Sequence, residues 1–181
     1  MLNVKAQAVG DDCRIKQSLL FDTSHLDRSV NVSGNRKKWT FSCWAKRCLG
    51  DVQVVFGTGN VESGTSFGGL YFDTDDSLMF FDPLCGATKQ TNAKYRDASS
   101  WYHIVTVLDV ANNAARIYIN GEEITDWKSS SSPIDVDGNI NNTTLHSIGK
   151  NPDTSAHYLK GYLSEIHFID GQALGPENFA L

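Results

Sequence analysis

Short runs of alternating apolar and polar residues, separated by turn residues, recur along the chain. The run 39–46 (WTFSCWAK) alternates large and small residues at a period of two, which is typical of a strand with one buried face. Similar β-rich runs occupy 19–21, 52–56, 69–72, 77–81, 101–109, 115–119, 144–149 and 158–170. No long amphipathic helix pattern occurs, and Pro176 indicates only a single helical turn near the end. The pattern therefore predicts an all-β protein.

The region 101–126 gives the clearest prediction of individual elements. Two apolar runs flank Asn120-Gly121, and this dipeptide is the strongest short hairpin signal, because both residues tolerate the positive φ of a type I′ turn. The region therefore predicts an antiparallel meander. Many short strands in 181 residues indicate two packed antiparallel sheets in one domain. We expect an N-terminal arm over residues 1–16 and a sandwich domain over residues 17–181, because the serine-rich stretch 129–133 is too short to separate domains.

Composition and charge narrow the range of partners. The net charge is −5, with 40% hydrophobic and 20% charged residues, which is ordinary for a globular protein with a core. The mild acidity argues against binding to nucleic acid or to a membrane, because both need clustered Lys and Arg. No apolar run is long enough to span a bilayer, and the start has no hydrophobic region of signal-peptide type. Cys13, Cys43, Cys48 and Cys85 lack zinc-site spacing and are interpreted as reduced thiols, with Cys43 in the core.

Several motifs carry a resemblance to a known family. They are SLLFD, NRKKWTFSCWAKR (35–47), YRDASSWYHIVTVLD (95–109), IYINGEEIT (117–125), NNTTLHSIGKN (141–151) and GYLSEIHFIDGQAL (161–174). Together they resemble concanavalin A-like, laminin-G-like domains, of the type found in bacteriophage tail and virion proteins. The resemblance implies a jelly-roll sandwich and a virion protein made in the host cytoplasm. It does not identify a ligand, because this superfamily includes lectins, hydrolases and structural modules.

Glu165, His167 and Asp170 are the first candidates for catalysis. In a regular strand, Glu165 and His167 share the less buried face, while Ile166 and Phe168 point into the core. Asp170 continues into a turn with Gly171, where aspartate is common for structural reasons. β-Glucanases of the superfamily carry a Glu-x-Asp-x-x-Glu or Glu-x-Asp-x-Glu strand motif, and its central Asp is missing here. The structural interpretation is preferred, and the chain is predicted not to be an enzyme.

Two acidic turns are candidate calcium sites. Asp135, Asp137 and Asn139 place three oxygen donors at alternate positions, as the start of an EF-hand loop does. The loop lacks the sixth-position glycine and the terminal bidentate glutamate of that motif. The other acidic turn is 73–76. A plain aspartate-rich turn is the preferred interpretation of both, so no cofactor is expected, with Ca²⁺ as the alternative.

Sugar recognition usually needs an exposed aromatic plane beside amide and carboxylate groups. Trp39, Trp44 and Trp101 are interpreted as core residues of their strands. Trp127 precedes the serine-rich stretch and is expected to be exposed. The polar loop 151–158 is the second candidate. The predicted glycan contacts are Trp127, Asn151, Asp153, His157 and Tyr158.

Three functional hypotheses follow. The leading one is a non-enzymatic virion module, in a tail fibre or on the virion surface, with lectin-like binding to host-surface glycan or to other virion proteins. The first alternative is a structural protein that decorates a capsid or joins tail parts. A homo-oligomer is a further expectation, although the sequence contains no coiled-coil heptads that would indicate one. The last alternative, a glycoside hydrolase, is disfavoured by the missing acidic motif.

Overall fold

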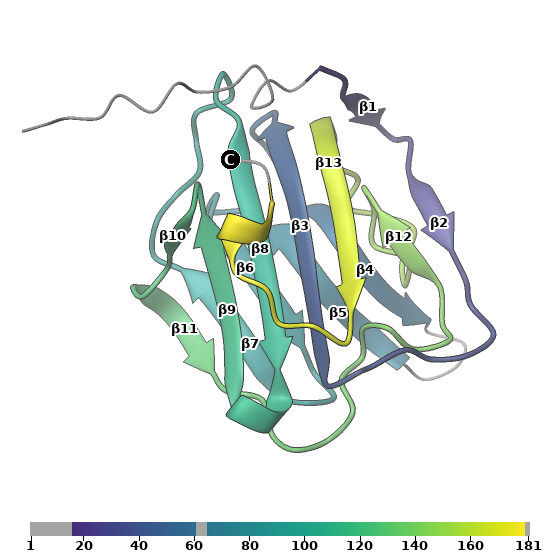
Figure 1. Ribbon diagram of the computed structural model, residues 1–181. Coiled ribbons are helices and arrows are strands. Elements are labelled where there is room, and N and C mark those ends of the chain that lie inside the picture. Colours follow the sequence, from purple (N-terminus) through teal and green to yellow (C-terminus); the bar gives the residue numbers. More distant parts are fainter. Residues whose placement is uncertain (1–15, 61–64, 180–181) are drawn as a thin grey trace, which may run out of the picture.

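The computed structural model describes residues 16–60 and 65–179. Two antiparallel sheets pack face to face as a sandwich (Figure 1), which confirms the predicted all-β fold. The six-stranded first sheet has the order β1-β13-β3-β8-β9-β10. Its strands are β1 (Leu19–Asp22), β3 (Lys38–Arg47), β8 (Tyr102–Asp109), β9 (Ala114–Ile119), β10 (Glu122–Glu123) and β13 (Lys160–Asp170). The arm expected over residues 1–16 lies, apart from Lys16, outside the described residues.

The seven-stranded second sheet has the order β11-β7-β6-β5-β4-β12-β2. Its strands are β2 (Leu26–Arg28), β4 (Gln53–Asn60), β5 (Thr65–Phe72), β6 (Leu78–Asp82), β7 (Ala87–Thr91), β11 (Trp127–Ser131) and β12 (His146–Ile148). The described residues also form two short 3-10 turns, η3 (Val110–Asn112) and η4 (Pro176–Asn178). Among the described residues, no helix has the length and apolar character that crossing a membrane requires.

The predicted meander is confirmed in detail. Strand β8 pairs with β9, and β9 pairs with β10, both antiparallel. Asn120 and Gly121 connect β9 to β10 with positive φ angles of 52° and 86°. These angles match a type I′ turn, which needs residues that accept the left-handed region. The short turn predicted after Pro176 is also present, as η4.

The chain changes sheet at both flanks of the sandwich. On one flank, β1 forms the edge of the first sheet, and β2 follows it directly as the edge of the second. On the opposite flank, β10 forms the other edge of the first sheet and is followed by β11 of the second (Figure 1). We call these the β1–β2 flank and the β10–β11 flank. At each flank, the space between the sheets is bounded by a crossover of the chain.

Several aromatic residues meet in the core between the sheets. Trp39 meets Phe80 edge-on with ring centroids 5.6 Å apart, and Phe41 stacks on Phe56 at 4.7 Å. Cys43 is fully buried in the same core, as predicted. Aromatic pairs of this kind stabilise a core beyond the apolar area that they bury.

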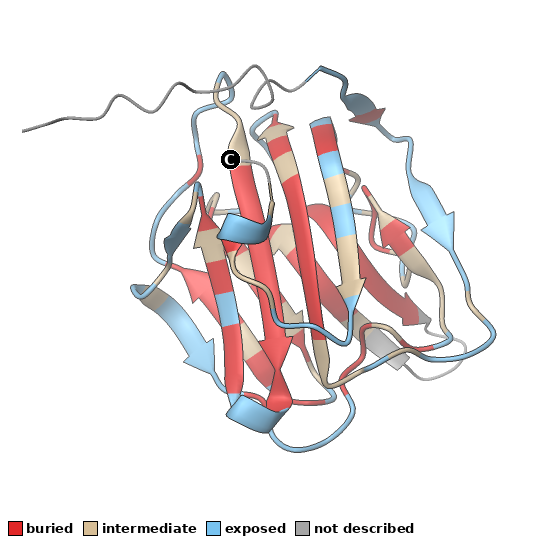
Figure 2. Cartoon of the chain, viewed as in Figure 1, coloured by how far each residue is buried: buried red, intermediate tan, exposed pale blue. Residues whose placement is uncertain are grey.

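Strand β3 is buried on both faces, not on one as its alternation suggested (Figure 2). The segment after β13 crosses the outer face of the first sheet (Figure 1). There Thr40 Oγ1 donates to the Gln172 carbonyl at 2.9 Å and accepts the Leu174 N–H at 2.9 Å. These hydrogen bonds fasten the segment to the sheet, so small polar residues of β3 become inaccessible.

The prediction that three tryptophans lie in the core holds only for Trp39, which is 1% exposed. Trp44 and Trp101 are half-buried. Strand alternation explains Trp44, because Trp39, Phe41 and Cys43 occupy the core-facing positions of β3 and Trp44 falls on the other face. Trp101 precedes β8, and its ring lies 6.4 Å from that of Tyr162.

Candidate functional site

The polar residues of β13 do not form one cluster. Glu165 and His167 are exposed on the surface, with Oε2 and Nε2 3.7 Å apart. A β-bulge interrupts the pairing of β13 with β3 between Ser164 and His167, and Glu165 has a φ of 47°. The extra residue shifts the alternation, so that both Leu163 and Ile166 face the core. The pair is therefore a surface contact beside a structural bulge.

Asp170 lies at the other end of this region, roughly 15 Å along the strand from Glu165. Its Oδ1 accepts the Asn35 N–H and the Asn141 side-chain amide, each at 2.7 Å. The Asp170 carboxylate is thus bonded to two segments that are distant in the sequence. Asp170 ties the connections before β3 and before β12 together, and it lines a hollow at one edge of the sandwich.

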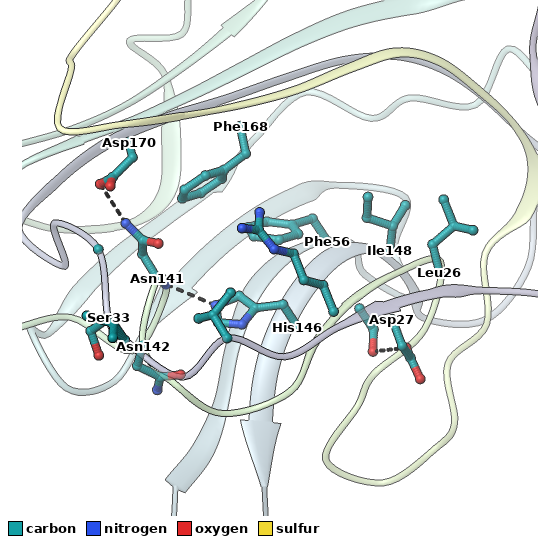
Figure 3. Close-up of a pocket in the computed structure, with 15 residues that line it drawn as sticks. Leu26, Asp27, Ser33, Phe56, Asn141, Asn142, His146, Ile148, Phe168 and Asp170 are labelled. Atoms are coloured by element: carbon teal, nitrogen blue, oxygen red, sulfur yellow. Dashed lines mark hydrogen bonds between the residues drawn. The ribbon is translucent and has the colours of Figure 1, made fainter.

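This hollow, which we call the edge cleft, opens at the β1–β2 flank (Figure 3). Its volume is about 440 Å³, a size that suits a small ligand. Strands β2, β4, β12 and β13 and the connection from Val30 to Gly34 contribute to its walls. Apolar and polar side chains both line it, which is the usual composition of a ligand site.

The apolar part of the edge cleft is aromatic. The rings of Phe56 and Phe168 lie 5.7 Å apart, and Phe56 stacks on His146 at 6.1 Å with an angle of 26°. Ile148 and the exposed Leu26 extend this surface toward solvent. Figure 3 shows these side chains along one side of the hollow. They offer a dry surface to a sugar ring or to another apolar group.

His146 cannot supply proton chemistry in this arrangement. Its Nε2 lies 3.0 Å from the Asn141 N–H, which can only donate, and its Nδ1 lies 2.9 Å from the Thr144 carbonyl, which can only accept. Both ring nitrogens are therefore occupied in one neutral tautomer. Burial lowers the pKa of His146, and the nearby Arg28 charge acts in the same direction, against the hydrogen bond to Thr144. The imidazole is a structural element of the wall.

Three polar groups of the edge cleft remain available to a ligand. Arg28 is exposed on β2 and makes no ion pair or side-chain hydrogen bond within the described residues. The second carboxylate oxygen of Asp170 has no hydrogen-bond partner among them either. Asn141 offers its amide oxygen, since its side-chain nitrogen is engaged by Asp170. A cation, a carboxylate and an amide thus surround the aromatic surface.

Gly34 allows the polar wall to close tightly. A Cβ atom at this position would lie 2.3 Å from Asn141 Nδ2 and 2.6 Å from Asp170 Oδ2. The Gly34 N–H also donates to the Asn141 carbonyl at 3.0 Å. Asn141 itself has a φ of 68°, which asparagine accepts more readily than most residues. The local sequence therefore fixes the position of the Asn141 and Asp170 side chains.

The predicted glycan contacts divide between two places. Trp127 was expected to be exposed, but it is half-buried on β11 at the β10–β11 flank, because its ring packs against the core. Lys89 Nζ lies 5.2 Å from its ring centroid. The loop 151–158 follows β12, five strand spacings or roughly 24 Å across the second sheet. The structure therefore does not bring these two candidates together.

Within the loop, side chains are mostly engaged locally. Asn151 is buried, and its Oδ1 accepts the Asp153 N–H at 2.9 Å. One carboxylate oxygen of Asp153 is buried without a partner in the described structure. His157 is exposed, and the half-buried Tyr158 lies 6.2 Å from the His25 ring. His157 and Tyr158 remain candidates for contact with a ligand.

The candidate calcium ligands point to separate partners. Asp135 pairs with Lys37 at 2.9 Å, and Asp137 with Arg36 at 3.7 Å. Asn139 is buried, and its N–H donates to both carboxylate oxygens of Asp82. In the described ranges, no group of three or more His, Cys, Asp or Glu side chains is arranged to hold a metal ion. Calcium binding stays a prediction.

The other acidic turn, at residues 73–76, is neutralised by basic side chains. Asp75 pairs with Lys94 and Lys128, and hydrogen bonds from Lys128, Lys94 and Ser77 hold the pKa of that carboxyl well below its usual range. Asp76 pairs with Arg47 and Arg96 at 2.8 and 3.1 Å. These carboxylates therefore stabilise the fold.

Comparison with known proteins agrees with this architecture. Residues 22–178 match the laminin G-type family model described as the concanavalin A-like lectin/glucanases superfamily. The chain belongs to this family. The family resemblance expected from the sequence motifs is thereby confirmed. No curated protein sequence matches the chain.

Several solved structures share the fold at low sequence identity. A heptameric SAP-like pentraxin from Limulus polyphemus has a TM-score of 0.60 and 15% identity, over 87% of this chain and 76% of the pentraxin. The CBM40 of Ruminococcus gnavus IT-sialidase has a TM-score of 0.57 and 12% identity, over 87% of this chain and 96% of the module. Domains LG4-5 of the mouse laminin α1 chain reach 0.57 and 16%, over 86% of this chain and 42% of that one. This family member therefore has the fold of carbohydrate-binding modules.

Proposed function

We propose that this domain is a non-enzymatic carbohydrate-binding module, and that the edge cleft holds the sugar. The observation that carries the proposal is an aromatic wall, Phe56 and Phe168, beside three polar groups that keep hydrogen-bonding capacity for a ligand in one cleft. Sugars combine apolar C–H faces with hydroxyl groups, so they need both kinds of surface. The related fold of a CBM40 with bound α2,3 sialyllactose supports the ligand class.

In this proposal, each wall of the edge cleft makes a different kind of contact with the sugar. Phe168, which packs on the buried Phe56, contacts a face of the sugar ring, and Asn141 accepts a hydroxyl hydrogen. Arg28 donates to a sugar oxygen, and Asp170 accepts a hydroxyl hydrogen on its free oxygen. His146 holds Asn141 in place through the Asn141 N–H. No step requires proton transfer, which is why the module is proposed to bind and not to cleave.

Calorimetric titration of a panel of bacterial and host-surface oligosaccharides tests the proposal. Arg28→Gln should weaken binding about tenfold or more, because a hydrogen bond to a charged group contributes about 1.5–3 kcal/mol. Lys160→Gln is the matched control, since it removes one exposed positive charge outside the cleft. Equal weakening by the two variants would show a diffuse charge effect and refute a site in the edge cleft.

The biological setting that we propose is the surface of a bacteriophage virion, where the module contacts host-surface glycan. The phage-type motifs in the sequence support this setting. Mass spectrometry of purified virions, followed by labelling of the chain in virion images, tests it. Absence of the chain from virions would refute it.

A second candidate function is a structural one, in which this domain attaches to another virion protein. Leu19 and Leu20 on the edge strand β1 are 50% and 60% exposed, and an exposed apolar strand edge favours contact with protein. Leu20→Lys should then abolish incorporation into particles while leaving sugar binding intact. Normal incorporation of this variant would remove the candidate.

A further inference from the structure

The β10–β11 flank contains a second hollow, which we call the Trp127 cleft. Its volume is about 300 Å³, and its walls include Lys89, Asn113, Arg116, Glu123, Ile124 and Trp127. Strands β7 and β11 supply one side, and strands β9 and β10 supply the other. The cleft therefore lies between the two sheets, across the sandwich from the edge cleft.

Lys89 is the unusual residue of this cleft. On β7 it alternates with Ala87, a core residue, and its cross-strand neighbour on β6 is the core residue Phe80. Lys89 thus projects from the core-facing side of the second sheet, where it is only 9% exposed. Lysine is rarely buried to this extent without a paired carboxylate, because removing an ammonium group from water is costly.

The ammonium of Lys89 is incompletely satisfied. It donates to Ser130 Oγ at 2.7 Å and lies over the Trp127 ring. An ammonium has three donors, and no carboxylate lies within ion-pair distance of Lys89 in the described structure. Burial lowers the pKa of Lys89, and the Glu123 charge opposes this only in part. A donor in a desolvated position is therefore left for an incoming group.

The other charges leave the cleft electropositive. Arg116 Nε lies 3.5 Å from Glu123 Oε1, so the single carboxylate of the wall already has a cationic partner. Both of these side chains are 45% exposed and stand at the rim, whereas Lys89 stands inside. An anionic group that entered the cleft would meet Lys89 without displacing a bound carboxylate.

We propose that the Trp127 cleft is a second carbohydrate subsite that takes an acidic sugar, with the carboxylate or sulfate group paired to Lys89 and the ring against Trp127. Asn113 and Arg116 lie where they can donate to the sugar hydroxyls. The positive charge of the wall favours a ligand with an anionic group. The Trp127 indole favours a ligand that contains a sugar ring over a simple ion. This subsite does not depend on the edge cleft, because the two hollows lie on opposite flanks.

Titration with three oligosaccharides of equal length tests the proposal: a galacturonate oligomer, a sulfated galactan oligomer and a neutral β-glucan oligomer. Binding of either acidic oligomer at least tenfold more tightly than the neutral one is expected, and the stronger of the two identifies the anionic group. Equal binding of all three would overturn the proposal. So would equal binding of a poly-glutamate peptide, because the cleft would then recognise charge alone.

Lys89→Met assigns the binding to this cleft, because methionine keeps the length of the side chain and removes the charge. We expect it to weaken binding of the acidic oligomer at least tenfold and to leave the melting temperature unchanged or higher, since no unpaired ammonium remains buried. Lys128→Met on the neighbouring strand β11 is the control, because that lysine is 46% exposed and pairs with Asp75. Wild-type binding by Lys89→Met, or equal loss in Lys128→Met, would overturn the assignment.

Discussion

Asp76→Asn should destabilise this domain far more than the same substitution at an exposed ion pair. Asp76 Oδ1 lies 2.8 Å from Arg47 Nη2, and the Arg47 side chain is fully buried. The guanidinium also lies 4.6 Å from the centre of the Phe72 ring, and its other terminal nitrogen has no partner within the described structure. Asp76 is therefore the main compensation for a charge buried at the end of β3.

The expected magnitude follows from this geometry. Removing one partner of a buried ion pair costs about 3–5 kcal/mol, because the other charge stays buried. Asparagine retains an oxygen that accepts from Arg47, which returns about 1 kcal/mol. Asparagine also tolerates the φ of 65° at this position, so backbone strain adds little. We expect a loss of about 2–4 kcal/mol, or roughly 4–16 °C in melting temperature for a domain of this size.

Thermal and urea unfolding, followed by circular dichroism, measure this loss. Asp135→Asn is the matched control, because Asp135 is 86% exposed in its pair with Lys37. Exposed pairs contribute about 0–1 kcal/mol, so this variant should melt within roughly 4 °C of the wild type. Similar melting temperatures for the two variants would show that Asp76 does not compensate a buried charge.

Three further predictions concern other parts of the domain. Ile104→Ala should cost about 2–5 kcal/mol in urea unfolding because this core residue is fully buried, while the exposed Glu165→Gln should cost under about 0.5 kcal/mol; equal losses would place Glu165 in a buried cluster. A thiol reagent should modify Cys48 in the folded protein but Cys43 only after unfolding, because burial raises the pKa of Cys43 and excludes the reagent. Rapid modification of Cys43 in the folded protein, detected by mass spectrometry, would contradict this. Burial lowers the pKa of His146 below 6.5, so the unfolded chain binds more protons than the folded one, and the free energy of unfolding should fall as pH drops below about 6.5. His146→Gln should flatten this pH dependence in urea melts. An unchanged slope would argue against a contribution from His146.

Local signals explain why much of the fold was predictable from the sequence. The hairpin at Asn120 and Gly121 depends on two adjacent residues with special φ preferences, and Cys43 lies in an alternating run. Information of this kind is contained in a few neighbouring positions. The family motifs added the sandwich, because they cover nearly the whole domain in order.

The edge cleft was not predictable in the same way. In the sequence, Arg28 lies more than a hundred residues from both Asn141 and Phe168. The crossover from β1 to β2 is what brings Arg28 to the cleft that the other two residues line. The alternating pattern of residues 39–46 likewise did not indicate that the C-terminal segment lies on the polar face of this strand. The bulge at Glu165 was hidden too, because the hydrophobic pattern of β13 changes phase by only one residue.

The Trp127 cleft shows which sequence signal could have been used. Trp127 was a candidate because of its position before a polar stretch, but Lys89 was not, although it lies in a strand whose alternate residues are Ala87 and Thr91. A lysine at a core-facing register position is a conflict between pattern and residue type, and such conflicts mark functional sites more often than chance.

The two clefts also explain where a sandwich of this kind can bind ligands. The interior between the sheets is filled by apolar and aromatic side chains, and the C-terminal segment crosses the outer face of the first sheet. At the flanks, the core-facing side chains Phe168 and Lys89 line hollows beside a crossover of the chain. A ligand at a flank therefore meets groups that the fold has already fixed and partly desolvated, so it binds with little ordering of the protein. Insertions in the two crossovers, 23–25 and 124–126, should accordingly alter sugar specificity while leaving the melting temperature nearly unchanged.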